Sequence, residues 1–137
     1  MIEGDDFHNE ENRARMAGGL PLRDADREAW LLGLVGELQQ RKGGAVLACS
    51  ALKRRYRDML RVASPDLAFV FLEITPEEAL RRVRLRGQHF FPPNLLQSQF
   101  ETLEAPVNEQ RVLWLDARLP LETLTAQTAQ WLIGSRE

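Results

Sequence analysis

The sequence contains a single cysteine, Cys49, and only two histidines, His8 and His89. One cysteine cannot form a disulfide within the chain, and the histidines lie too far away in sequence to build a metal cluster around it. No apolar run approaches the roughly 18 residues that a membrane span needs, and the first dozen residues are acidic, unlike the basic start of a signal peptide. We therefore expect a cytoplasmic protein with no membrane partner.

A strong excess of one charge is also lacking. The formal net charge is -2 over 137 residues, which argues against general binding to nucleic acid. The charges are nevertheless unevenly spread, because residues 1–12 carry five acids and no Lys or Arg, whereas residues 53–61 and 81–86 are strongly basic. Such clusters suit a metal-bound polyphosphate substrate, but composition alone favours an ordinary salt-bridged surface.

What the chain does contain is an alternation of short apolar runs and helical patterns. Three runs rich in β-branched and aromatic residues predict buried parallel strands, at residues 45–49, 67–74 and 111–115. Three longer stretches predict helices, at residues 24–42, 75–86 and 120–133. Thr75-Pro76 gives the second of these helices an N-cap and a proline in its first turn. This order predicts one α/β domain over residues 1–137, with a parallel sheet covered on both faces.

The beginning of the chain resembles the end of a strand. Met1-Ile2 is followed at once by the polar cluster Glu3-Gly4-Asp5-Asp6. A strand of two residues is not stable on its own. We therefore expect that an upstream segment is missing, through a gene-model error or a real deletion.

The acidic cluster predicts a ligand site or a simple turn. Glu3, Asp5 and Asp6 would lie at the carboxyl end of a strand, where open α/β sheets bind ligands. In phosphoryl transfer to an alcohol, one carboxylate can accept the hydroxyl proton while another helps to position Mg²⁺. A solvated acidic turn that caps the next helix explains the same residues equally well.

Two basic segments also admit two interpretations. Ser50 directly follows strand 45–49 and is placed to cap a helix on which Lys53 and Arg57 share one face, so this face could hold an anion. Arg82 and Arg86 come before a glycine, an aromatic pair and two prolines, which predicts a hinged lid over about residues 82–104 that closes over a nucleotide. A solvated cationic flank and a surface helical hairpin are the alternatives.

Three stretches taken together resemble the gluconate kinases of the P-loop shikimate/gluconate kinase family. They are GDDFHNEENRARMAGGLPLRDADREAWL (residues 4–31), CSALKRRYRDMLR (49–61) and HFFPPNLLQSQFETLEAP (89–106). The resemblance extends over nearly the whole chain in the right order. It implies a nucleoside-monophosphate-kinase-like three-layer fold and ATP-dependent phosphorylation of D-gluconate to 6-phospho-D-gluconate, with Mg²⁺. Since related kinases are often dimers, a homodimer stays open beside a monomer.

The resemblance also implies roles for single residues. On the catalytic side, Asp5 would be the general base and Glu3 would stand near Mg²⁺, directly or through water. The residues that it places on the sugar side are His8, Lys53, Arg57 and Gln99. Those that it places on the ATP side are the lid arginines Arg82 and Arg86, with Asp116 and Pro120 near the adenine.

The chain departs from the family pattern in three places. The family's His-Pro is His8-Asn9 here, and the glycine expected just before the lid histidine is displaced, since the chain reads Gly87-Gln88-His89. The third departure is the largest. No G-x-x-x-x-G-K-[ST] motif occurs anywhere, and neither Lys42 nor Lys53 follows a glycine.

The missing motif has a structural and a functional consequence. The family's phosphate loop follows a central strand that would lie between strands 45–49 and 67–74, and its loss would leave about 9–10 Å between strands that normally pair at about 4.8 Å. We therefore expect a poorly stable chain with impaired turnover. The alternatives are a noncatalytic remnant that binds a sugar acid or a protein partner, and a related kinase of the shikimate type.

Overall fold

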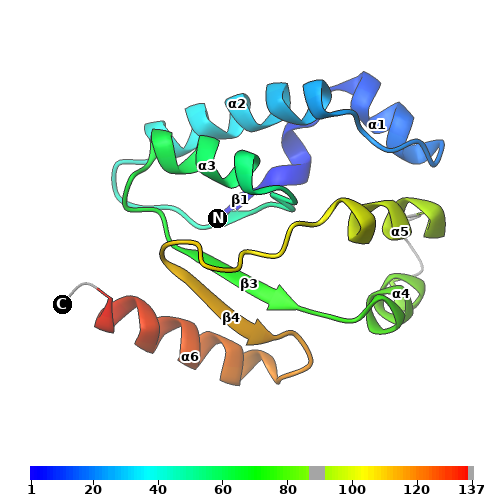
Figure 1. Ribbon diagram of the computed structural model, residues 1–137. Coiled ribbons are helices and arrows are strands. Elements are labelled where there is room, and N and C mark those ends of the chain that lie inside the picture. Colours follow the sequence, from blue (N-terminus) through cyan, green and yellow to red (C-terminus); the bar gives the residue numbers. More distant parts are fainter. Residues whose placement is uncertain (87–91, 136–137) are drawn as a thin grey trace.

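The computed structural model describes residues 1–86 and 92–135, and its strands and helices alternate along the chain (Figure 1). The elements are β1 (Ile2–Glu3), the 3₁₀ helix η1 (Gly4–Phe7), α1 (Glu10–Ala17), α2 (Asp24–Gln40), β2 (Leu47–Ala48), α3 (Arg54–Ala63), β3 (Phe69–Glu73), α4 (Pro76–Leu85), α5 (Pro93–Thr102), β4 (Val112–Asp116) and α6 (Leu121–Gly134). Helices α2 and α3 lie together on one side of the strands and α6 lies beside β4 on the other (Figure 1). The predicted α/β class is confirmed.

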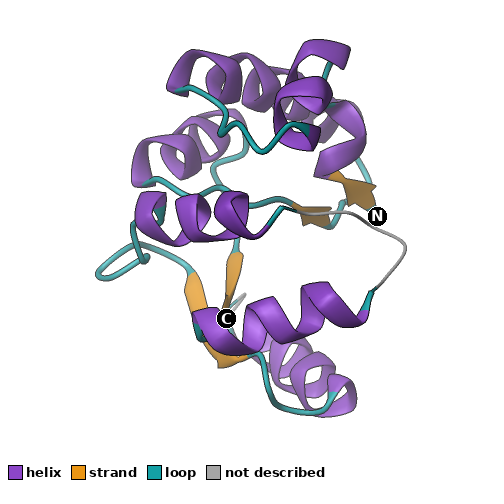
Figure 2. Cartoon of the chain, turned by 90° about the vertical axis from the view of Figure 1, so that its right-hand side faces the viewer, coloured by secondary structure: helices purple, strands orange, loops and turns teal. Residues whose placement is uncertain are grey.

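The four strands are parallel but form two separate pairs. β1 pairs with β2, and β3 pairs with β4 in a register that places Phe69 opposite Val112. Within residues 1–86 and 92–135, β2 and β3 do not pair with each other, as the sequence predicts, and Figure 2 shows the two pairs apart. A cavity of about 570 Å³ lies beside β3, lined by this strand, by α5 and by the loop before α3.

The first strand corrects one expectation. A two-residue strand was not expected to be stable, yet β1 forms because it is anchored at both its side chain and its backbone. The Ile2 side chain is only 2% exposed, and the Ile2 N–H donates to the Val46 carbonyl at 2.7 Å. The partner strand is shorter than the predicted residues 45–49, since Val46 is 67% exposed and has no core to pack against.

Helix starts show which caps the sequence can predict. Thr75 caps α4 as expected, because its hydroxyl accepts a hydrogen bond from the Glu78 N–H at 3.2 Å. The prediction that Ser50 caps α3 is wrong. Ala51 has a left-handed φ of 35°, which turns the chain before the helix begins at Arg54. The Arg54 N–H instead donates to the Glu104 carboxylate at 2.9 Å.

The hydrophobic core lies between β1, α2 and α3. Its buried members are Ile2, Trp30, Leu31, Leu34, Ala51, Tyr56 and Leu60. All of them come from the first half of the chain, so the elements around β1 and β2 are held by apolar packing of their own. None of the described helices is both long and apolar enough to cross a membrane.

Candidate functional site

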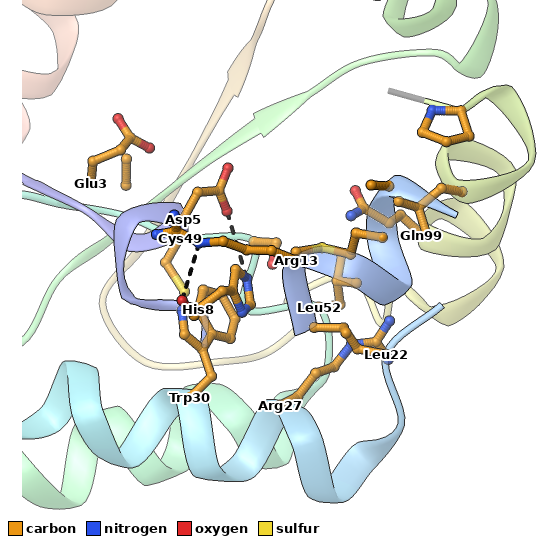
Figure 3. Close-up of a pocket in the computed structure, with 16 residues that line it drawn as sticks. Glu3, Asp5, His8, Arg13, Leu22, Arg27, Trp30, Cys49, Leu52 and Gln99 are labelled. Carbon is orange, nitrogen blue, oxygen red and sulfur yellow. Dashed lines mark hydrogen bonds and ion pairs between the residues drawn. The ribbon is translucent and has the colours of Figure 1, made fainter. Parts of the chain in front are cut away.

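A pocket of about 470 Å³ lies where the carboxyl ends of β1 and β2 meet α1, α2 and α5 (Figure 3). Its polar lining includes Glu3, Asp5, His8, Arg13, Arg27, Ser50 and Gln99, and its apolar lining includes Trp30, Leu52 and Leu95. The structure therefore brings together four of the residues predicted from sequence, namely Glu3, Asp5, His8 and Gln99. The carboxyl end of parallel strands is where α/β folds commonly bind ligands.

Gly4 fixes the position of the acidic turn at the pocket rim. A Cβ added to Gly4 would lie 2.5 Å from the Ala48 carbonyl oxygen, so only glycine lets η1 approach β2 this closely. The Trp30 indole N–H also donates to the Gly4 carbonyl at 2.8 Å. The backbone before Asp5 is thereby held between a strand and a buried tryptophan.

His8 is held within the pocket wall by a stack and two polar neighbours. Its ring stacks on Trp30 with centroids 4.3 Å apart. The Asn12 amide is oriented to donate to His8 Nδ1 at 3.4 Å, which leaves Nε2 to carry the proton and to face the Asp5 carboxylate at 3.9 Å. Burial lowers the pKa of His8 from its ordinary value of 6.5. The imidazole is therefore neutral at neutral pH.

The two carboxylates at the rim differ from His8 in being open to solvent. The Asp5 side chain is 83% exposed, and Glu3 is exposed beside it. Among residues 1–86 and 92–135 there is no group of three or more His, Cys, Asp or Glu side chains that could hold a metal ion. The assignment of Glu3 to Mg²⁺ stays a prediction.

Two arginines complete the pocket and were not singled out from the sequence. Arg13 uses its guanidinium to bind backbone carbonyls, at 3.2 Å to His8 and 2.9 Å to Asp6. Arg27 is half-buried on α2, and no carboxylate in the described part of the chain forms an ion pair with either arginine. The signal for Arg27 was present, since it precedes Trp30 by three residues and so shares its helical face.

Cys49 also lines the pocket but does not act as a nucleophile there. Burial raises the pKa of its thiol to about 11. A thiol with this pKa stays protonated at neutral pH, and it is the thiolate that reacts. The side chain therefore contributes shape to the pocket wall.

Lys53 and Arg57 do not join the other sugar-side candidates. Lys53 donates to the Asp24 carboxylate at 2.9 Å, and the Tyr56 hydroxyl donates to the same oxygen. The hydrogen bonds from Tyr56 and then Lys53 lower the pKa of Asp24 to about 2. Arg57 is buried and bonded to Glu109 at 2.6 Å. The shared anion-binding face expected for Lys53 and Arg57 does not form, because each cation is paired with a carboxylate of the chain.

The predicted nucleotide-side residues gather at a different corner of the molecule. Arg82 donates to the Ala117 carbonyl at 2.9 Å and to Glu78 at 3.1 Å, which places it beside the turn after Asp116. Pro120 caps α6 at the end of the same turn. Arg86 is the exposed C-cap of α4.

The predicted lid is described only in part. Helices α4 and α5 pack against each other. The expected hinge at residues 87–91, with its histidine and aromatic pair, lies outside the described residues. Closure over a nucleotide therefore stays a prediction.

Comparisons with known proteins agree with the resemblance of the three sequence stretches. The chain is 38% identical to the thermosensitive gluconokinase of Escherichia coli (strain K12) over 141 residues, which cover 100% of this chain and 75% of that protein. A crystal structure of a gluconokinase from Sinorhizobium meliloti 1021 superposes with a TM-score of 0.86 at 43% identity, covering 96% of this chain and 75% of that one. An unliganded sugar kinase from Janibacter sp. HTCC2649 gives a TM-score of 0.89 at 41% identity, covering 96% and 78%.

No model of a known protein family matches the chain. The identity to curated relatives and the shared three-dimensional structure are nevertheless both high, and they extend over nearly the whole chain. The strands and helices described above are thus those of a P-loop kinase-like α/β fold. The chain belongs to the gluconokinase branch of the shikimate/gluconate kinase family.

Proposed function

We propose that the protein transfers a phosphoryl group from ATP to the terminal hydroxyl of D-gluconate, giving 6-phospho-D-gluconate and ADP. Membership of the gluconokinase family supports the reaction class. The observation that carries the proposal is the pocket itself. It combines an exposed carboxylate at Asp5, a neutral imidazole at His8 and the guanidinium groups of Arg13 and Arg27.

The charges of the pocket suit a sugar acid better than a neutral sugar. Arg13 and Arg27 can pair with the carboxylate of the ligand, because no described carboxylate of the chain pairs with them. The volume of about 470 Å³ lies within the range of roughly 300–1,000 Å³ that is usual for small-molecule sites. We place the carboxylate end of D-gluconate against the two arginines, so that the far hydroxyl contacts Asp5.

The residues around the far hydroxyl supply acid–base chemistry. Asp5 holds the terminal hydroxyl and accepts its proton, which makes the oxygen a better nucleophile. The Nε2 proton of His8 donates to a neighbouring hydroxyl, and the Gln99 amide on α5 can bond another. Burial is the largest cause of the lowered pKa of His8, and the cationic Arg13 and Arg27 also help to keep the imidazole neutral.

The nucleotide side of the chain fits its ligand less completely. ATP supplies the phosphoryl group when bound, but the sequence has no glycine-rich phosphate motif to surround it. Arg82 is already bonded to Glu78 and Ala117, whereas Arg86 is exposed. Contacts of Arg82, Arg86, Asp116 and Pro120 with ATP, and of Glu3 with Mg²⁺, stay predictions, and no step is assigned to them.

A coupled assay of gluconate-dependent ADP formation tests the proposal. It should be run on the 137-residue chain and on a version extended upstream through any in-frame glycine-rich loop. Turnover in the extended version alone supports a gluconokinase whose phosphate loop lies upstream. Turnover in both would mean that other residues bind the phosphates. No turnover in either, with intact folding, contradicts the proposal.

The role of Asp5 has a matched control in its neighbour. Replacing Asp5 by Asn should lower turnover at least about 10²-fold if it is the general base, the usual scale of this contribution. Asp6→Asn removes an equally exposed acid that does not line the pocket and should leave turnover nearly unchanged. A near-normal rate for Asp5→Asn would show that another group accepts the proton of the substrate hydroxyl.

A second function is favoured by the contrast between the two sides. His8 and Gln99 line one pocket with Arg13 and Arg27, whereas the given sequence has no phosphate motif, which supports a protein that binds a sugar acid without turning it over. Calorimetric titration with D-gluconate in the absence of nucleotide, beside the coupled assay, separates the two functions. We place either activity in the cytoplasm, where ATP and sugar acids occur together.

A further inference from the structure

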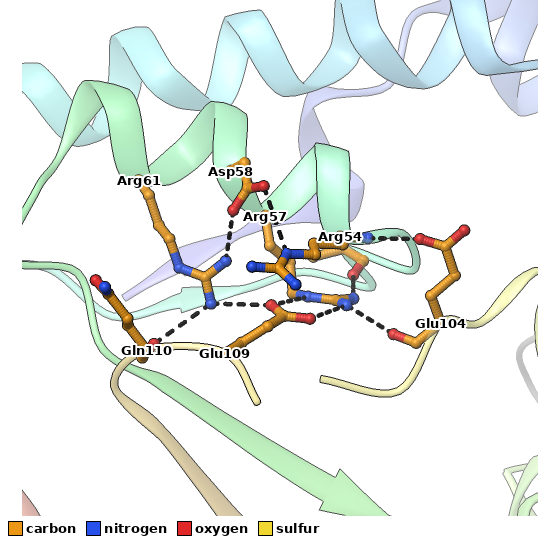
Figure 4. Close-up of polar contacts among 8 residues, drawn as sticks. Arg54, Arg57, Asp58, Arg61, Glu104, Glu109 and Gln110 are labelled. Atoms are coloured by element: carbon orange, nitrogen blue, oxygen red, sulfur yellow. Dashed lines mark hydrogen bonds and ion pairs between the residues drawn. The ribbon is translucent and has the colours of Figure 1, made fainter. Parts of the chain in front are cut away.

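Arg57 is enclosed in the protein rather than open to a ligand. It is 4% exposed, and its guanidinium group makes four hydrogen bonds in the described residues (Figure 4). Nε and one terminal nitrogen bind the two oxygens of Glu109 at 2.8 and 2.6 Å, and the other bonds go to the Ala51 carbonyl at 2.8 Å and the Glu104 carbonyl at 2.7 Å. A buried cation persists only with such a set of partners.

The Arg57 partners belong to two segments far apart in sequence. Ala51 lies in the loop between β2 and α3, whereas Glu104 and Glu109 follow α5. Two further bonds join the same segments, since the Glu104 N–H donates to the Leu52 carbonyl at 2.7 Å and the Glu104 carboxylate caps Arg54 at 2.9 Å. We call the group formed by Arg57, Glu104 and Glu109 the Arg57 clamp.

The loop that the clamp holds is a strained one. Ala51 has a φ of 35°, a left-handed conformation that residues with a Cβ rarely adopt. It persists only where surrounding contacts impose it. The hydrogen bond from Arg57 to the Ala51 carbonyl is such a contact, and it acts between Ser50 and Leu52, which both line the sugar-side pocket.

The clamp therefore joins two walls of the pocket. One wall is the loop with Ser50 and Leu52, and the other is α5 with Leu95 and Gln99.

 Leu95 and Gln99 both belong to α5 and line the pocket from that side. The clamp fixes the end of α5 against the loop, so the distance between the two walls depends on it.

We propose that Arg57 is a positioning residue of the gluconate pocket, which sets the spacing between the Ser50–Leu52 loop and Gln99 through Glu104 and Glu109 and does not itself contact the sugar acid. The inference rests on the proposed function for the identity of the ligand. It replaces the direct contact with gluconate that the resemblance implied for Arg57.

The test removes the charge of Glu109 and follows gluconate binding by calorimetry well below the melting temperature of each variant. Glu109→Gln keeps the size of the side chain but weakens its hydrogen bonds with Arg57. Glu101→Gln is the matched control, because it makes the same change at an exposed carboxylate on α5 that accepts from Gln97 and does not belong to the clamp. We expect the Kd for D-gluconate to rise about tenfold in Glu109→Gln, as is usual within one hydrogen-bond network, and to stay within about twofold in Glu101→Gln.

A direct contact between Arg57 and gluconate predicts the opposite result. Glu109→Gln would then release the guanidinium and leave binding equal or tighter, whereas Arg57→Lys would weaken it. Positioning predicts that Glu109→Gln and Arg57→Lys weaken binding alike, because lysine cannot reproduce the four bonds. A lowered melting temperature with an unchanged Kd would make the clamp purely structural and would overturn the proposal.

A failure of the proposed function gives a different result. If the unaltered protein binds no D-gluconate, the ligand assignment fails, and amide hydrogen exchange then decides the positioning role. Glu109→Gln should speed exchange at the Arg54 and Glu104 amides, which join the two walls, by about tenfold. Unchanged exchange at both amides would overturn the clamp itself.

Discussion

The first half of the chain supplies every buried member of the hydrophobic core, whereas the strands and the last helix of the second half are less completely covered. Around β1 and β2, Leu31 and Leu34 are 0% exposed. Around β3 and β4, Leu72 is 50% exposed and Trp114 39%, and no described residue of α6 is buried. The sugar-side pocket is lined mainly by the first half, whereas the predicted ATP contacts lie on the second. The half with its own core thus supplies most of the ligand pocket, and α5 adds Leu95 and Gln99.

The largest expected difference between the two halves is in the effect of truncating a leucine in each. Leu31→Ala should lower the free energy of unfolding by about 2–5 kcal/mol, because it opens a cavity in a closed core. Leu72→Ala deletes the same atoms from a half-exposed strand position. It should change the free energy of unfolding by less than about 1 kcal/mol. Urea denaturation of both variants measures the difference. Equal losses would show that the second half is packed as tightly as the first.

A pair of glycines tests whether close backbone approach shapes the pocket. Gly4→Ala places a Cβ against the Ala48 carbonyl and should lower the free energy of unfolding by about 1–3 kcal/mol, with weaker gluconate binding. In Gly33→Ala on α2 the added Cβ meets no atom within 4 Å, so this variant should raise the free energy of unfolding by about 0.5–1 kcal/mol. Thermal melts and calorimetry on the two variants give the comparison. Stabilisation by Gly4→Ala would contradict the tight approach of η1 to β2.

The two halves should also respond to pH in different ranges. Burial lowers the pKa of His8 in the folded state, so the unfolded chain binds the proton more readily and stability falls as pH drops below about 6.5. Arg81 and Arg82 lower the pKa of Glu78 from 4.5 to about 2, so its contribution is lost only as pH falls from 4.5 towards 2. Amide hydrogen exchange in α2 between pH 5 and 7.5, and in α4 between about pH 2 and 5, measures both. His8→Asn should remove the pH dependence of α2, and its persistence would assign that dependence elsewhere.

The smallest effect concerns a single carboxyl in the first half. Tyr56→Phe removes the hydrogen bond that contributes most to the lowered pKa of Asp24, so this pKa should rise from about 2 towards 3.8. Lys53→Met should raise it less. Carboxyl titration followed by NMR measures both, with Glu78 as the internal control because its partners are untouched. A larger shift for Lys53→Met would reverse the order of the two causes.

Local patterns in the sequence predicted much of the fold. The strand at Phe69–Glu73 and the cap at Thr75 follow from residues that are neighbours in the chain, and both were found within two residues of their expected place. The Ser50 cap failed because its replacement, Glu104, lies 50 residues away from Arg54. The resemblance placed Arg57 near the ligand, and its pairing with Glu109, 52 residues away, follows from no local pattern.

The candidate pocket was predicted in part. Glu3, Asp5, His8 and Gln99 were found through motifs that resemble a family, and the structure brings them together. Arg13 and Arg27 were missed because a charged residue on a helix is usually a solvated one, and only the folded chain shows which of them line a cavity. Spacing alone could have indicated Arg27, which shares a helical face with Trp30.

The separation of the two strand pairs has a consequence for how the chain unfolds. No ladder of backbone hydrogen bonds joins β2 to β3 in the described residues, so the halves are coupled through loops, through the Arg57 clamp and through Leu67 and Phe69, which pack against the core. Weak coupling lowers cooperativity, and the two halves then behave as distinct foldons. Denaturation followed by different probes should give transitions that do not coincide, and a single melting temperature would describe neither half.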